Sequence, residues 1–278
     1  MTDTQPHAKH PPLRVGLIGF GAIGRRLAEA IVAGQAGRCE LAAVLVRRPE
    51  RIGHDVAARL GCAVTGDAAD FLATRLDLVV EVAGHDALKA YAEDVLRQGK
   101  DLLLISVGAL ADPRFEQRLY RAAHDYGRRV YLATGAIAGL DAISAGAVGG
   151  LESVTHSVRK PPAGLLPPDE IEAAKASGVP RVLYEGPARE AALRFPENVN
   201  VAAAVSLAGL GLDKTVVRVV ADPTVLRNTH EIDVKGEFGE LKILLQNIPT
   251  ENPKTGRLTA MSMVKALRNL TANVVVGL

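Results

Sequence analysis

The stretch LRVGLIGFGAIGRRLAEAI, residues 13–31, decides the fold of the first half of the chain. An apolar run breaks at three glycines and then resumes with apolar residues three and four apart, which is the spacing of a helix. A strand, a G-x-G-x-x-G turn and a helix in this order are typical of a dinucleotide-binding βαβ unit. The glycines permit a tight turn, let the backbone approach a pyrophosphate, and let the helix pack close to the strand. We therefore expect the cofactor to contact Gly19, Gly21, Ala22, Ile23 and Gly24.

The second strand of such a unit usually ends in an acid, and here the stretch CELAAVLVRRPE, residues 39–50, ends in Arg47 and Arg48 instead. A carboxylate would bind the ribose hydroxyls of NAD and repel the 2′-phosphate of NADP. A guanidinium group pairs with phosphate. The sequence therefore favours NADP, with use of NAD left open, and the alternative is that these arginines only face solvent before a helix.

Length and composition restrict the classes of protein to consider. The chain has 278 residues, of which 48% are hydrophobic, and a formal net charge of +2, which is too small to suggest a nucleic-acid partner. The two cysteines, Cys39 and Cys62, stand in no C-x-x-C motif, so we expect reduced thiols and a cytoplasmic location. We expect no membrane association, because no apolar run is long enough for a membrane span. We also expect no metal, because the sequence has no H-E-x-x-H motif and no cysteine cluster.

The pattern of apolar residues divides the chain into parts. Residues 13–135 alternate strand and helix candidates and predict an α/β domain with the doubly wound parallel sheet of a Rossmann fold. Residues 136–255 predict a second, α+β domain with strands over 153–160, 215–222 and 230–238, and residues 256–278 predict a helix that could complete the first domain. We expect residues 1–12 to form a disordered tail.

In open α/β sheets the ligand lies beyond the carboxyl ends of the strands. The segments that follow the later strands are AGHD (83–86), SVGALAD (106–112) and TGAIAGLD (134–141), so we expect them to line the nicotinamide end of the cofactor. Ala83 and Ser106 are the contacts expected from the first two segments.

Several long motifs together resemble the L-aspartate dehydrogenase family over nearly the whole chain. They are EVAGHDALKAY, SVGALAD, GAIAGLDAI, YEGPAREAALRFPENVNVAAAVSLAGLG and NTHEIDVKGEFGE. The resemblance implies NAD(P)-dependent conversion of L-aspartate and water to oxaloacetate and ammonia through iminoaspartate, which can feed quinolinate and hence NAD biosynthesis. It also implies a homodimer. By the same match, His230 falls on the family's catalytic histidine, and Ala136 and Asn200 fall on positions associated with cofactor contact.

The chemistry of that reaction is consistent with a histidine in this role. Oxidation of a C–N bond requires a neutral amine, a hydride acceptor over Cα and a base that activates water, and an imidazole suits both proton steps. Three neighbours in the sequence could orient the His230 ring or its water, namely Asn228, Thr229 and Glu231. His85, after a strand of the first domain, and His156, in a strand of the second, are alternative candidates for a direct role.

A dicarboxylic substrate needs cations or N–H groups around it. Lys160, Asn198 and Asn228 are the expected substrate contacts, and Lys235 is a weaker candidate. Two other functions are compatible with the same architecture. One is a related two-domain NAD(P)H reductase that acts on another small dicarboxylate, and the other is a dinucleotide sensor without catalysis.

Overall fold

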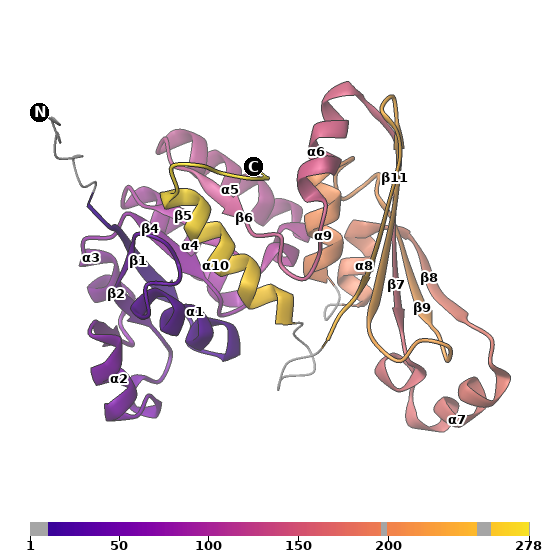
Figure 1. Cartoon of the computed structure of the whole chain (residues 1–278), viewed down its shortest axis with the longest axis horizontal. Coiled ribbons are helices and arrows are strands. Elements are labelled where there is room, and N and C mark those ends of the chain that lie inside the picture. Colours follow the sequence, from indigo (N-terminus) through magenta and orange to yellow (C-terminus); the bar gives the residue numbers. More distant parts are fainter. Residues whose placement is uncertain (1–10, 196–198, 249–256, 278) are drawn as a thin grey trace, which may run out of the picture.

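The computed structural model describes residues 11–195, 199–248 and 257–277, which form two packed lobes (Figure 1). Most of the expected N-terminal tail, and Asn198, lie outside the described residues. Among the residues that are described, no helix has the length and hydrophobicity needed to cross a membrane.

The first lobe is built on a six-stranded sheet that is parallel throughout. Its strands have the order β3-β2-β1-β4-β5-β6. The chain runs outward from β1 to β3, crosses back to β4 beside β1, and then runs outward on the other side. This order confirms the doubly wound, Rossmann-type sheet that the sequence predicts. The strands are β1 (Leu13–Ile18), β2 (Cys39–Leu45), β3 (Ala63–Thr65), β4 (Leu78–Glu81), β5 (Asp101–Leu104) and β6 (Val130–Leu132).

Helices cover both faces of this sheet, and their ends follow local signals. Asp67 and Asp112 cap the helices that they precede, because each carboxylate accepts two backbone N–H groups of the first turn. The helical segments are α1 (Ala22–Val32), η1 (Pro49–Arg51), α2 (His54–Leu60), α3 (Ala68–Ala73), α4 (His85–Arg97), η2 (Val107–Ala111) and α5 (Pro113–Asp125).

The second lobe contains a five-stranded mixed sheet in the order β11-β10-β7-β9-β8, in which only β7 and β9 are parallel. Helices α6, α8 and α9 lie between this sheet and the first lobe, and α7 lies beyond one end of the sheet (Figure 1). The strands are β7 (Leu151–Lys160), β8 (Arg181–Pro187), β9 (Val216–Ala221), β10 (Thr229–Gly236) and β11 (Gly239–Gln246). The helices are α6 (Leu140–Gly149), η3 (Pro162–Gly164), α7 (Pro168–Ser177), α8 (Ala188–Arg194) and α9 (Val199–Ala208).

The C-terminal helix α10 (Arg257–Thr271) returns to the first lobe (Figure 1). Met263 and Leu267 are fully buried in the same hydrophobic cluster as Leu27 and Ile31 of α1. This packing agrees with the expectation that the chain end completes the first domain, while the residue boundaries of the domains stay predictions.

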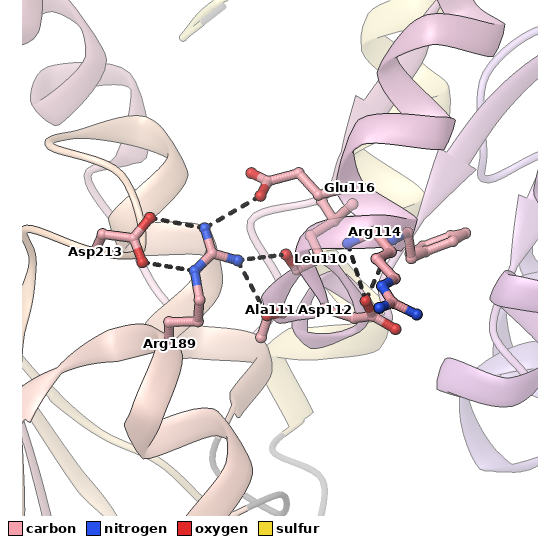
Figure 2. A network of polar contacts seen from close by, with 8 residues as sticks. Leu110, Ala111, Asp112, Arg114, Glu116, Arg189 and Asp213 are labelled. Atoms are coloured by element: carbon pink, nitrogen blue, oxygen red, sulfur yellow. Dashed lines mark hydrogen bonds and ion pairs between the residues drawn. The ribbon is translucent and has the colours of Figure 1, made fainter.

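Arg189 of α8 ties the two lobes together (Figure 2). Its guanidinium group donates to both carboxylate oxygens of Asp213 at 2.6 and 2.9 Å and to Glu116 of α5 at 3.2 Å. It also donates to the carbonyl oxygen of Ala111, at the end of η2, at 3.0 Å. The segment that follows β5 is therefore held directly by a side chain of the second lobe.

Candidate active site

The glycine-rich turn follows β1 and has no space for side chains at two of its positions. Gly19 has φ +102°, and a Cβ there would lie 2.8 Å from the Cα of Ala83. A Cβ on Gly24 would overlap the carbonyl oxygen of Gly19. Glycine is therefore required at Gly19 because the turns after β1 and β4 approach each other closely, and at Gly24 because the helix packs against the turn itself.

Gly21 differs from its neighbours, because a Cβ there would meet no protein atom within 4 Å. It is the N-cap of α1, and its backbone leads into Ala22 and Ile23, the first residues of the helix. No side chain caps this end, so the free N–H groups and the positive end of the helix dipole face open space. This is the environment that a pyrophosphate needs, and these residues fit a dinucleotide.

A cavity of about 380 Å³ lies beside this turn. Among the described residues, none of its three arginines forms an ion pair, so three positive charges surround one space. Arg48 lines the cavity and Arg47 does not, which separates the two arginines that the sequence left as alternatives. The lining residues are Phe20, Arg25, Val46, Arg48, Arg51, Ile52, Gly53 and Val56.

At the same edge of the sheet, where β4 ends, a fully buried acid organises two turns. Glu81, the last residue of β4, accepts hydrogen bonds from the backbone N–H groups of Ala83 and Gly84, both at 2.7 Å. It also accepts the hydroxyl of Ser106 at 3.0 Å. Burial raises the pKa of Glu81, and these hydrogen bonds oppose that shift. Ala83 and Ser106, expected at the nicotinamide end, are thus positioned by one carboxylate.

Asn200 of α9 reaches the same region from the second lobe. Its Oδ1 lies 2.9 Å from the Nε2 of His85 and accepts the backbone N–H of Gly108 at 2.9 Å. An amide oxygen is only an acceptor, so Nε2 is the nitrogen of His85 that carries the hydrogen in this contact. The structure therefore brings together Asn200, which the family resemblance places at the cofactor, and two of the turns expected to line it.

His230 lies on β10, and 6% of its surface is exposed. Its Nδ1 lies 3.1 Å from the Nε2 of His156, a fully buried residue of β7. Burial and, to a smaller extent, the positive charge of Lys160 together lower the pKa of His230 to about 4. The pKa of His156 is well below its ordinary value, because the ring is entirely removed from water and lies beside His230. Both rings are therefore neutral at neutral pH.

Lys160 ends β7 and is buried, with 9% of its surface exposed.

Ala136 and Asn228 are connected by Asn247, a residue that the sequence analysis did not single out. The side-chain amide of Asn247 donates to the carbonyl oxygen of Ala136 at 3.3 Å. Its backbone N–H donates to the carbonyl oxygen of Asn228 at 3.0 Å. Lys235 pairs with Glu240 at 2.8 Å with both side chains 54% exposed, which is the geometry of a surface ion pair.

Sequence reasoning missed other residues of this site as well. Arg25 and Arg51 line the arginine cavity but lie outside the strand end on which the prediction concentrated. The sequence did carry a signal for Glu81 as a site residue. It is the single acid in the otherwise apolar strand Leu78–Glu81, and the turn that contains Gly84 follows it.

The chain was compared with known protein families and structures. Residues 19–133 match the family model described as homoserine dehydrogenase, NAD binding domain, and residues 141–270 match aspartate dehydrogenase, C-terminal. The chain is 38% identical to an L-aspartate dehydrogenase of Methanosarcina barkeri, over 95% of this chain and 99% of that protein. It is 42% identical to L-aspartate dehydrogenase 3 of Bordetella bronchiseptica, over 95% and 97%. The crystal structure of an aspartate dehydrogenase from Thermotoga maritima superposes with a TM-score of 0.75, at 28% identity over 95% and 99% of the two chains.

Proposed function

The chain belongs to the L-aspartate dehydrogenase family, and we propose that it oxidises L-aspartate with NAD(P), with His230 as the residue that moves the proton. The reaction consumes L-aspartate, water and the oxidised cofactor, and yields oxaloacetate, ammonia, the reduced cofactor and a proton. The observation that carries the residue assignment is the buried, neutral imidazole of His230 beside the cation Lys160.

The cofactor supplies the acceptor for the hydride that leaves Cα of the substrate. The chain's own residues supply its binding sites: free N–H groups at Gly21 and the start of α1 for the pyrophosphate, and Arg48 with its neighbours for the adenosine end. We propose NADP as the preferred cofactor, with NAD also accepted, because the arginine cavity suits a 2′-phosphate.

L-Aspartate reaches the site as an ammonium ion, and the amine must lose a proton before hydride can leave Cα. A pKa of about 4 keeps His230 neutral at neutral pH and able to accept that proton. A substrate carboxylate paired with Lys160 would offset the charge that lowers this pKa and so make His230 a stronger base. Substrate binding and base strength are therefore coupled through Lys160.

The second proton step is hydrolysis of iminoaspartate. His230 first releases to solvent the proton that it took from the ammonium group. Water then adds to the imine carbon, His230 takes a proton from the water and returns it to the departing nitrogen, and oxaloacetate and ammonia result. Asn228 is proposed to contact the substrate and to orient the water beside His230, and Ala136 and Asn200 are proposed to contact the cofactor. Asn198, the proposed second anchor for the substrate, lies outside the described residues.

The biological setting of the enzyme is also a proposal. We place it in the cytoplasm, because both cysteines are free thiols. We propose a homodimer, because no described helix covers the face of β10 and β11 that points away from α6 and α9, and Leu244 on β11 is 65% exposed (Figure 1). Iminoaspartate released before hydrolysis would be available for NAD biosynthesis.

Replacement of His230 tests the proposed role. His230→Ala should lower kcat by about two to four orders of magnitude, which is the usual contribution of a general acid or base. Cofactor affinity, measured by fluorescence titration with NADPH, should stay near the wild-type value because His230 lies in the second lobe. His124→Ala is the matched control, since that side chain is 90% exposed on α5. Turnover of His230→Ala close to that of the control would assign the proton transfer to another residue.

A further inference from the structure

We propose that His156 is a positioning residue for the reaction, which accepts a hydrogen bond from Nδ1–H of His230 and so directs the lone pair of the His230 Nε2 toward the substrate. The inference rests on the proposed role of His230. It goes beyond that role by assigning the hydrogen of the neutral His230 ring to Nδ1 and not to Nε2.

The two rings form a fixed pair. They are stacked, with centroids 5.3 Å apart and planes inclined by 19°, and the Nε2 of His156 lies 3.1 Å from the Nδ1 of His230. His156 is 0% exposed and stands opposite Ile232 of β10 and Val217 of β9 in the sheet register. Its neighbours on the adjacent strands are therefore apolar, and the hydrogen bond of its ring is made to His230.

A hydrogen bond between two neutral imidazoles requires one N–H and one lone pair. If His156 were the donor, the hydrogen of His230 would sit on Nε2, and Nε2 could not accept a proton. Protonation of His230 would then direct one N–H against another. If His156 is the acceptor, Nε2 of His230 has a free lone pair, and the imidazolium formed by proton uptake keeps its Nδ1–H paired. Only this second arrangement is compatible with a base at position 230.

The charged groups around the pair support an uncharged acceptor. Lys160 is the cation whose field reaches His230. Helix α9 has no charged residue, the one charged residue of α6 is the exposed Asp141, and β11 presents Leu245 opposite His230. No described acid therefore takes the orienting role on this face, and His156 performs it while staying neutral.

The arrangement has a consequence for stability. The hydrogen of His156 then lies on Nδ1, which is buried and has no hydrogen-bond partner among the described residues. An unpaired buried donor destabilises the folded state. A leucine at this position removes that donor and leaves the buried Nδ1–H of His230 without its acceptor, so one unpaired donor replaces another and Tm should change little. A positioning role therefore predicts a loss of kcat without a loss of Tm, whereas a purely structural role predicts a loss of Tm.

The experiment compares His156→Leu with His156→Gln, whose amide oxygen can replace the Nε2 acceptor. His156→Leu should lower kcat about 10- to 100-fold, the range seen when a group that orients a functional histidine is removed. It should leave the KM for NADP unchanged and should not lower Tm. His156→Gln should recover most of kcat. Full activity in His156→Leu, or an equal loss in both variants, would overturn the proposal.

A measurement on the unmodified enzyme tests the same inference without any substitution at position 156. Two-bond ¹H–¹⁵N spectra report which ring nitrogen carries the hydrogen, and His230→Ala identifies the His230 signals by their loss. The result expected is a protonated Nδ1 and an unprotonated Nε2. A hydrogen on Nε2 would overturn the proposal even if His230→Ala is inactive, whereas an active His230→Ala would instead refute the proposed function.

Discussion

Two adjacent arginines at the end of β2 have different surroundings. Arg48 lines the cavity beside the glycine turn together with Arg25 and Arg51, whereas Arg47 does not line it. The Arg25 guanidinium also lies 5.8 Å from the ring centroid of Phe20, so this side chain is held near the turn. We infer that Arg48 is the member of the pair that recognises a 2′-phosphate.

Substitution of each arginine separately tests this assignment. Arg48→Asp should raise the KM for NADP by about tenfold or more relative to that for NAD, because a hydrogen bond to a charged group contributes about 1.5 to 3 kcal/mol. Arg47→Asp introduces the same change of charge outside the cavity and serves as the matched control. Steady-state kinetics with both cofactors measure the effect. Equal changes for NAD and NADP, or a larger effect from Arg47→Asp, would rule out recognition by Arg48.

The site residues differ in how far the sequence could predict them. Gly19, Gly21 and Gly24 form a local motif whose spacing alone specifies a turn against a helix end. The contact between His156 and His230 depends on the pairing of β7 with β10, which are 74 residues apart at this point. No local pattern contains that information, so sequence analysis left the two histidines as alternatives although they are hydrogen-bonded partners.

At the scale of elements, the long helices were predictable from their apolar faces, whereas β3 and α3 were not predicted. Helices α1, α4 and α5 have 11 to 13 residues with clear apolar faces, whereas β3 and α3 have three and six residues, too few to show a period. Strand β11 was missed for another reason. Its apolar residues, at positions 241, 243, 244 and 245, fit both strand and helix spacing, and pairing with β10 decides between them.

The contacts that Arg189 of α8 makes with the first lobe should contribute to the free energy of unfolding. The side chains of Arg189 and Glu116 are each 20% exposed, so Arg189→Met leaves the half-buried Glu116 carboxylate and the buried carbonyl oxygen of Ala111 unpaired and should lower the free energy of unfolding by about 2 kcal/mol. Arg218→Met is the control, because its pair with Glu185 is 48% exposed on both sides and should contribute less than about 1 kcal/mol. Urea denaturation measures both, and equal losses would show that Arg189 adds no more than a surface ion pair.

At the scale of the whole molecule, the two lobes divide the work of the reaction. The first lobe presents the glycine turn, the arginine cavity and the turns held by Glu81 at one edge of its sheet. The second lobe presents His230 and Lys160 on the sheet face that helices separate from the first lobe (Figure 1). The fold shared with other dehydrogenases does not specify the substrate, which only the residues of the site can select.

A panel of substrates tests whether L-aspartate is the preferred substrate. Initial rates of NAD(P)H formation are measured with L-aspartate, L-glutamate, L-alanine and L-malate at matched concentrations and with both cofactors. We predict that kcat/KM for L-aspartate exceeds that for L-glutamate at least about tenfold, because one added methylene in a fitted site costs about 1 to 3 kcal/mol. Alanine lacks the second carboxylate, and malate lacks the amine whose proton we propose that His230 accepts, so both should be poorer still. A kcat/KM for L-glutamate or L-malate equal to that for L-aspartate would contradict the account.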